Sequence, residues 1–226
     1  MPSRSGRAPA TEVGVASGPA FVRLTRGVFA LLLAVSLVAF AATAADTAPR
    51  GQAAAGKSLL TALRDGGYIL YFRHTATDFS QNDDQMTGYE DCARQRNLTD
   101  AGRADARAIG ASIRALGIPI GEVLASPFCR TRETAELMFG RATISDAVRG
   151  GPASTEGGRY EELRALLARP VPGKVNLVIA SHGNPFAAIA GTPYLAEGEA
   201  AVIGPLGGGS FAVVARIRKD QWSELK

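Results

Sequence analysis

Residues 68–74 read Tyr68-Ile69-Leu70-Tyr71-Phe72-Arg73-His74, five apolar or aromatic residues followed by two basic ones. The glycine pair Gly66-Gly67 precedes them. A short, continuous apolar run that begins after turn residues is typical of a strand buried on both faces. We therefore expect a central strand at Tyr68–Phe72 that presents Arg73 and His74 at its carboxyl end.

Helical and strand-like segments alternate after this run. We expect helices at Lys57–Arg64, Thr99–Leu116, Cys129–Phe139, Tyr160–Ala168 and Asn184–Ala190. We expect further strands at 122–126, 175–180, 200–203 and 211–217, with a turn at Gly204–Gly209 between the last two. Such alternation predicts an α/β fold, a three-layer sandwich with a mostly parallel central sheet.

Chemically active side chains follow three of the predicted strands. Arg73-His74 follows the first, Ser126 to Arg130 the second, and Ser181-His182 the third. The chain has only two histidines, and both occur at these strand ends. Because ligands of parallel sheets bind at the carboxyl ends of the strands, we predict one site at this edge.

Two histidines and two arginines can form a pocket for a phosphoryl group. A neutral imidazole is the attacking form, and neighbouring arginines disfavour the imidazolium while they bind phosphoryl oxygens in pairs. One histidine would attack phosphorus and the other would hold its oxygens. The arginines would stabilise the developing charge, so we expect no metal or other cofactor. We also expect Asn184 to cap the helix that follows His182, with its positive end toward the pocket.

Four ordered motifs resemble the histidine phosphatase superfamily, which has the phosphoglycerate mutase-like fold. They are Arg73-His74-Thr75-Ala76-Thr77, Leu98-Thr99-Asp100-Ala101-Gly102, Ser126 with Arg130, Thr134 and Ala135, and Ser181-His182-Gly183. The resemblance, strongest to small single-domain exported phosphatases, implies His74 as the nucleophile. It also implies Arg73, Arg130 and His182 as catalytic and phosphate-binding residues, with Thr77 in support. The chain departs from the family pattern at Thr75, where the family has Gly, and at Ser80, where many members have Asn.

These observations predict a metal-independent phosphatase that hydrolyses a phosphomonoester or phosphohistidine through a covalent phosphohistidine intermediate on His74. Its partner would be a small phosphorylated substrate or a phosphorylated envelope component. The alternative is a catalytically silent protein that binds a phosphorylated ligand of the cell envelope. An ordinary alcohol leaving group needs a proton donor. The candidates for this donor are Asp78, Asp146 and Glu156.

Residues 1–45 have the pattern of an export signal. They hold Arg4, Arg7, Arg23 and Arg26 against one acidic residue, followed by an apolar run and small residues at Ala41–Ala45. We expect a periplasmic or secreted protein; an uncleaved leader would instead anchor it to the membrane. A linker at 46–56 and a phosphatase domain at 57–226 would follow. The leader carries most of the formal charge of +4, and no basic stripe follows it, so we expect no nucleic-acid partner.

Two other features need an interpretation. Gly51–Ser58 matches the letters of a phosphate-binding loop, but no strand precedes it, so we interpret it as part of the linker. Cys92 lies in the long acidic loop Thr75–Asn97, and Cys129 precedes Arg130. In an exported protein these two cysteines would form a disulfide, which we expect, or stay as buried thiols. The loop itself is either a lid, suited to a substrate with a cationic part, or a solvated excursion.

Overall fold

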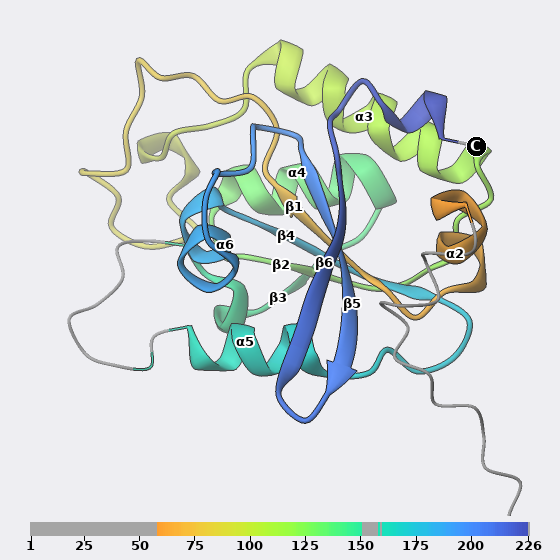
Figure 1. The fold of residues 1–226 in the computed structure, drawn as a ribbon. Helices are drawn as coiled ribbons and strands as arrows, with labels where there is room; N and C mark the ends of the chain where they lie inside the picture. The colour runs from red at the N-terminus through yellow and green to blue at the C-terminus, as the bar shows by residue number, and fades with distance from the viewer. Residues whose placement is uncertain (1–57, 151–157, 159, 226) are drawn as a thin grey trace, which may run out of the picture. The chain divides into compact units, whose positions relative to one another are not determined.

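The computed structural model describes residues 58–150, 158 and 160–225 (Figure 1). The elements run in the order α2 (Leu59–Asp65), β1 (Ile69–Arg73), η1 (Cys92–Arg94), α3 (Asp100–Ala115), β2 (Ile120–Ala125), α4 (Cys129–Phe139), β3 (Thr143–Ile144), η2 (Asp146–Val148), α5 (Glu161–Ala168), β4 (Asn176–Ser181), α6 (Gly183–Ala190), β5 (Ala200–Gly207), β6 (Ser210–Ile217) and η3 (Trp222–Glu224). The predicted leader at 1–45 and linker at 46–56 lie outside the described residues. No helix within that described part is long and apolar enough to cross a membrane.

Six strands form one mixed sheet in the order β3-β2-β4-β1-β5-β6. The neighbours β3, β2, β4 and β1 are parallel, while β5 runs antiparallel to both β1 and β6. The predicted α/β sheet with mostly parallel strands is therefore confirmed. The first predicted strand, β1, lies near the middle of the sheet, and its residues Ile69 to Phe72 are fully buried.

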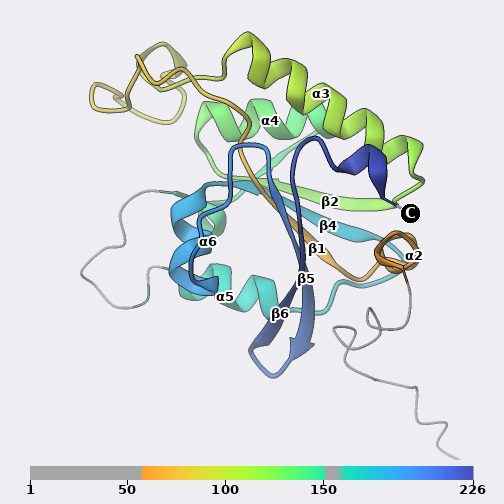
Figure 2. The same cartoon turned by 45° about the horizontal axis from the view of Figure 1, so that its top comes forward.

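Helices cover both faces of the sheet and make three layers (Figures 1 and 2). One core cluster packs α2, α3 and α4 against alternate strand residues such as Leu70, Phe72 and Val178. The other cluster packs α5 and α6 against the intervening residues, such as Tyr71 and Ile179. The alternation follows from the strand geometry, because successive side chains point to opposite faces of the sheet.

Local sequence signals explain how α3 begins and how it packs. The hydroxyl of Thr99 accepts a hydrogen bond from the Gly102 N–H at 3.0 Å, which caps the predicted helix start. Gly110 faces the Met138 carbonyl of α4, and a β-carbon at that position would overlap it. The two helices can therefore approach closely, and α4 begins at Cys129 against the end of β2, as predicted.

The end of the chain differs from the prediction in one turn. Residues 204–206, which we expected in a turn, continue β5, and the chain reverses at Gly207, Gly208 and Gly209, all with positive φ. β5 pairs with β1 only as far as Ile203, so the next residues form an open edge on that side. Proline is tolerated at such an edge, which explains how Pro205 lies within a strand.

Candidate active site

The predicted site residues meet at the carboxyl ends of three parallel strands. Arg73 is the last residue of β1, Ser181 is the last residue of β4, and the register pairs these two residues. β2 ends at Ala125 beside Ala180, which brings Ser126 and the start of α4 to the same edge. His74, Arg130 and His182 follow directly from these strand ends. The sheet topology thus brings together residues that are far apart in the sequence.

The two histidines lie side by side in the interior. Their ring centroids are 5.5 Å apart and nearly perpendicular, and the residues are only 2% and 4% exposed. Nδ1 of His74 lies 2.9 Å from the backbone carbonyl of Thr75. Since a carbonyl oxygen only accepts hydrogen bonds, the proton of a neutral His74 ring is on Nδ1. The lone pair is then on Nε2, the nitrogen that faces away from this bond.

His182 is held at its other nitrogen. Its Nε2 lies 2.8 Å from the hydroxyl of Ser126, and its backbone carbonyl accepts a hydrogen bond from the Tyr71 hydroxyl. The Phe128 ring packs edge-on against the imidazole at 5.1 Å. A β-carbon on Gly150 would overlap the imidazole ring. His182 is therefore fixed on several sides.

Both histidines are neutral at ordinary pH. Burial is the main cause that lowers the pKa of His74 to about 3, and the positive charges of Arg130, Arg73 and Arg96 act in the same direction. Burial and the same arginines lower the pKa of His182 well below its usual value. The site therefore combines uncharged imidazoles with permanent cations, as the sequence analysis anticipated.

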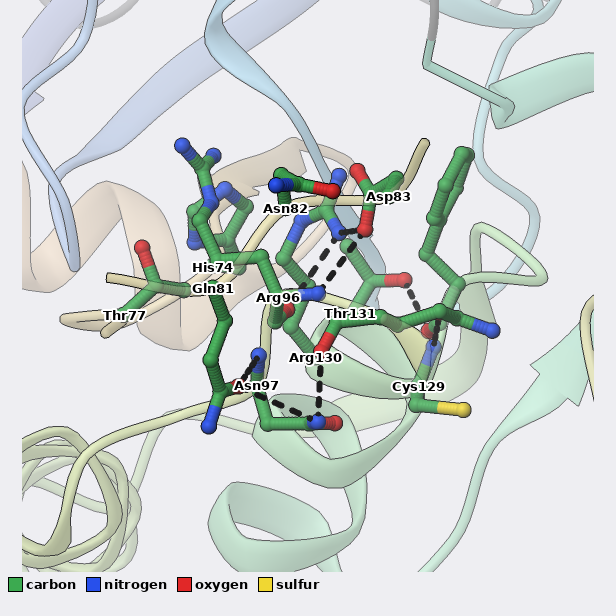
Figure 3. A network of polar contacts seen from close by, with 12 residues as sticks. His74, Thr77, Gln81, Asn82, Asp83, Arg96, Asn97, Cys129, Arg130 and Thr131 are labelled. Carbon is green, nitrogen blue, oxygen red and sulfur yellow. Dashed lines mark hydrogen bonds and ion pairs between the residues drawn. The ribbon is translucent and has the colours of Figure 1, made fainter. Parts of the chain in front are cut away.

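Arg130 is the most buried of these cations, with 5% exposure. Its Nη1 donates to Asp83 at 3.0 Å (Figure 3), and its guanidinium lies over the Phe128 ring at 4.4 Å. Its Nε is buried without a hydrogen-bond partner among the described residues, and so is Nε of Arg96. Buried N–H groups of this kind favour an incoming acceptor. Arg96 is thus a third arginine of the site, which the sequence analysis did not identify.

Arg73 and Thr77 share a carboxylate that sequence reasoning also missed. Glu197 Oε1 accepts from the Thr77 hydroxyl at 2.7 Å and lies 3.5 Å from Arg73 Nη2. The same oxygen is 3.9 Å from His74 Nδ1. Glu197 lies just before β5, the antiparallel strand that begins beside the end of β1. Thr77 therefore lies at the site, as predicted, but its hydroxyl is directed to Glu197.

Of the three predicted proton donors, Asp78 has its carboxylate engaged in a turn. The Asp78 carboxylate accepts from Ser80 N–H and hydroxyl at 2.9 and 2.7 Å, which lowers its pKa and disfavours the protonated form. Asp146 is an exposed residue of η2, and Glu156 lies outside the described residues. The carboxylates that contact the arginines and Thr77 are instead Asp83 and Glu197.

The loop Thr75–Asn97 is fixed to the beginning of α4. A disulfide joins Cys92 to Cys129 with a Cα–Cα distance of 5.7 Å, so of the two alternatives the disulfide is present. The Cys129 N–H donates to the buried Gln95 side chain at 3.0 Å. Asp83 reaches both Arg130 and the backbone N–H of Arg96, at 3.0 and 2.9 Å (Figure 3). The loop thus covers the arginine side of the site.

One further expectation, the cap of α6, has a clear outcome. The predicted cap of α6 is wrong, because His182 is the N-cap residue and Asn184 lies inside the first turn. The helix therefore begins one residue earlier, directly at the site.

Within residues 58–150, 158 and 160–225, no cluster of three or more His, Cys, Asp or Glu side chains could hold a metal ion. Ser58, the last residue of the phosphate-loop-like stretch, caps α2 through a hydrogen bond from the Thr61 N–H.

Residues 69–169 match the family described as the histidine phosphatase superfamily (branch 1). No curated protein matches the sequence. Among solved structures, the putative phosphohistidine phosphatase SixA from Agrobacterium tumefaciens is 15% identical, with a TM-score of 0.46 over 67% of this chain and 97% of that chain. The protein histidine phosphatase SixA in complex with tungstate is 18% identical, with a TM-score of 0.48 over 68% and 98%. A mycobacterial glucosyl-3-phosphoglycerate phosphatase is 14% identical, with a TM-score of 0.46 over 61% and 90%.

Proposed function

We propose that the chain is a member of the histidine phosphatase superfamily, whose model matches residues 69–169, and that it is a phosphatase that works through a covalent phosphohistidine on His74. The observation that carries the proposal is the protonation state of His74. Its Nδ1–H is bound to the Thr75 carbonyl, so the nucleophilic lone pair is on Nε2. Burial and nearby arginines lower its pKa to about 3, which keeps this lone pair unprotonated at neutral pH.

The arginines and His182 form the cradle for the transferred phosphoryl group. Arg130 now pairs with Asp83, and Arg73 with Glu197. A bound phosphoryl group would replace these carboxylates on the guanidinium groups, which suit phosphoryl oxygens because each can donate two parallel hydrogen bonds. His182, held by Ser126, would contact another oxygen. This fixed positive charge would stabilise the transition state, as preorganised cations do in a dry site.

The reaction would proceed in two displacements at phosphorus. The Nε2 lone pair of His74 forms a bond to phosphorus while the ester P–O bond breaks, and the leaving oxygen takes a proton from an acid. Water then attacks the phosphohistidine, the P–N bond breaks, and the water proton returns to the carboxylate. Inorganic phosphate leaves, and His74 regains its neutral form. All steps are carried by side chains of this protein, without a metal.

We assign the proton donor to Asp83. Its carboxylate lies 3.0 Å from Arg130 Nη1 and reaches the site from the covering loop. A phosphoryl dianion on Arg130 would take the place of this ion pair and would place negative charge beside the carboxyl, which favours its protonated form. Glu197 is less suited, because its Oε1 accepts from the Thr77 hydroxyl and would keep that hydrogen bond after a phosphoryl group had replaced it on Arg73.

The first experiment is hydrolysis of 4-nitrophenyl phosphate and a panel of phosphomonoesters and phosphohistidine by the purified protein in excess chelator. We expect turnover that the His74→Asn variant lacks. If no substrate of the panel is turned over, the result would favour the alternative function, a catalytically silent protein that binds phosphorylated ligands. Turnover that chelator abolishes would overturn the metal-independent mechanism.

The proton donor is tested with two leaving groups. Asp83→Asn should lower kcat/KM, which reports phosphoryl transfer to His74, about 10²-fold for ethyl phosphate, whose alkoxide needs a proton. The loss should be only a few-fold for 4-nitrophenyl phosphate, which has a stable leaving group. Asp84→Asn, an exposed neighbour on the same loop, is the matched control. Equal losses for the two esters in Asp83→Asn would contradict a role in proton transfer.

We also propose that the protein acts outside the cytoplasm. The basic and apolar pattern of residues 1–45 supports this location, and the Cys92–Cys129 disulfide is the form that cysteines take in oxidising compartments. Mass spectrometry of the exported protein should find an N-terminus near Ala45 or Asp46. An intact leader in the membrane fraction would favour the anchored form instead.

A further inference from the structure

Two aromatic side chains are unusually exposed in the described part of the chain. Phe79 is 70% exposed and Tyr194 is 56% exposed, whereas the other exposed large hydrophobic residues there, Ile144, Leu206 and Val213, range from 41% to 46%. Single exposed apolar residues are common on protein surfaces. These two differ from the others because each packs against an arginine region of the candidate active site.

Phe79 is presented by an ordered turn. The Gln81 N–H donates to the Asp78 carbonyl at 3.1 Å, and the Asp78 carboxylate binds both the N–H and the hydroxyl of Ser80. The Asp78 N–H also donates to the Asn97 carbonyl, which ties the turn to the other end of the loop. Turn corners usually carry Gly, Pro or short polar residues. A phenyl ring is therefore an uncommon side chain at this corner.

The Phe79 ring lies against Arg96. The guanidinium carbon of Arg96 is 4.8 Å from the ring centroid. Arg96 belongs to the site, because its carbonyl accepts from Arg130 Nη1 at 3.4 Å and its N–H donates to Asp83 at 2.9 Å. Its positive charge also contributes to the lowered pKa of both His74 and His182. One face of the Phe79 ring thus covers a cation of the site, and most of the ring remains exposed.

The backbone around Tyr194 is held by two arginines. The carbonyls of Pro193 and Tyr194 each accept from Arg216 at 2.8 Å, and the Leu195 carbonyl accepts from Arg73 at 2.9 Å. The ring lies against Gly183, where a β-carbon would be only 3.0 Å from Tyr194 and 3.4 Å from Arg73. Glycine directly after His182 therefore allows the Tyr194 ring to lie close to Arg73.

We propose that Phe79 and Tyr194 form an aromatic rim that binds a flat ring on the leaving group of the substrate. The inference rests on the proposed phosphatase function and narrows its substrate class to phosphomonoesters with an aromatic ring near the ester oxygen. Rigid aromatic side chains bind flat rings with little loss of conformational entropy, and stacked or edge-to-face pairs add affinity beyond the buried area. The phosphoryl group would occupy the arginine cradle while the ring contacts the rim.

The positions of the apolar surfaces favour a ring over an acyl chain. An apolar cavity is lined by Pro170, Val171 and Leu177, at the start of β4. It therefore lies at the opposite end of the strands from His74. A long chain seated in that cavity would not reach the phosphoryl site. The rim offers two separate rings at the site itself, which matches a compact ligand.

The test compares 2-phenylethyl phosphate with n-butyl phosphate, because both have primary alkoxide leaving groups and differ in the ring. The wild-type protein should prefer the phenyl ester in kcat/KM. In Phe79→Ala and in Tyr194→Ala, the loss for the phenyl ester should exceed the loss for the butyl ester by about 3- to 10-fold. Leu206→Ala, on an exposed apolar residue of β5, is the matched control and should keep the preference. The ester of 2-cyclohexylethanol separates stacking from apolar contact, since it should behave like the butyl ester.

A binding experiment separates this inference from the phosphatase function. Calorimetry with 3-phenylpropylphosphonate and butylphosphonate, which cannot be hydrolysed, should show the same preference and the same loss in the two rim variants. If the wild-type protein prefers the phenyl ligand but turns over no ester, the result supports the aromatic rim and contradicts the phosphatase function. An unchanged preference in both rim variants, or a wild-type protein that binds the two phosphonates equally, would overturn the aromatic rim.

Discussion

The ends of β1 and β4 carry the same residue type in the same place but hold it in opposite ways. His74 follows β1 and is 2% exposed, and His182 follows β4 and is 4% exposed. The backbone of Thr75 binds His74 at Nδ1 at 2.9 Å. The Ser126 hydroxyl binds His182 at Nε2 at 2.8 Å. The two histidines therefore differ in which ring nitrogen is hydrogen-bonded.

This difference suggests two roles for two equally buried imidazoles. A carbonyl can only accept, so it fixes the neutral tautomer of His74 and leaves a lone pair on Nε2. A hydroxyl can donate or accept, so Ser126 allows His182 to change its role as the charge on a bound phosphoryl group changes. The structure thus favours His74 as the nucleophile and His182 as the residue that holds oxygens. Substitutions at the two strand ends test this asymmetry.

The largest effect is expected at His74. In His74→Asn the side-chain amide can still donate to the Thr75 carbonyl, but it has no nucleophilic lone pair. We expect kcat to fall about 10⁴-fold or more, the scale seen when a covalent nucleophile is removed. Hydrolysis of 4-nitrophenyl phosphate measures the loss, and brief exposure to labelled substrate should yield an acid-labile phosphoenzyme in the wild-type protein only. Label retained in His74→Asn would place the nucleophile elsewhere.

Replacement of His182 should have a smaller and different effect. His182→Gln keeps an amide near the position of Nε2 and beside Ser126. Loss of one group that stabilises transition-state charge typically lowers kcat about 10²- to 10³-fold. The variant should still form the phosphoenzyme, only more slowly, as rapid-quench labelling can measure. A variant that forms no phosphoenzyme at all would contradict the proposed division between the two histidines.

The dependence of stability on pH should be the property that the two histidines share. The pKa of His74 is about 3 in the folded protein and near 6.5 in the unfolded chain, so the unfolded chain binds more protons between these values. Stability is therefore lost as pH falls through this range, by about 2 kcal/mol for His74 at pH 5. The lowered pKa of His182 acts in the same direction. Urea unfolding at pH 7 and pH 5 measures the loss.

The matching variants should remove part of this dependence. His74→Asn should lose about 2 kcal/mol less than the wild-type protein between pH 7 and pH 5. His182→Gln should also reduce the loss, because that ring is neutral and buried too. The carboxyl groups with lowered pKa, such as Asp78 and Glu199, lose stability only at lower pH. An unchanged pH dependence in His74→Asn would mean that the folded protein binds a proton there readily.

Much of the site was predictable because it follows strand ends. The apolar run that ends in Arg73-His74 determines where the strand stops, and parallel strands bring their carboxyl ends to one edge. Arg130 and His182 were predicted in the same way, because they follow the ends of two other strands. The basic residues that follow three strand ends were a local signal in the sequence, and the resemblance to the family implied their roles.

The residues that sequence reasoning missed are on connections, where no periodicity applies. Asp83 and Arg96 belong to a loop of about 23 residues, and only its attachment to α4 brings these two to Arg130. Glu197 reaches Thr77 because β5 turns back antiparallel to β1, a pairing that the spacing of the strands does not reveal. Asp78, in contrast, was predicted as a proton donor but has another role in the structure. Its proximity to His74 in sequence suggested catalysis, but its carboxylate stabilises the turn that carries Phe79.

The smallest effect is expected from Ser126→Ala, which tests the His182 side alone. The substitution removes the hydroxyl at 2.8 Å from Nε2 but leaves the ring packed against Phe128. A buried hydrogen bond of this kind contributes about 1 kcal/mol, so kcat should fall about 5- to 10-fold. Phosphoenzyme formation on His74 should remain, because the Thr75 carbonyl and not Ser126 sets the His74 tautomer. If Ser126→Ala were as inactive as His74→Asn, the hydroxyl itself would take part in bond formation, and the asymmetry between the two strand ends would be assigned to the wrong residue.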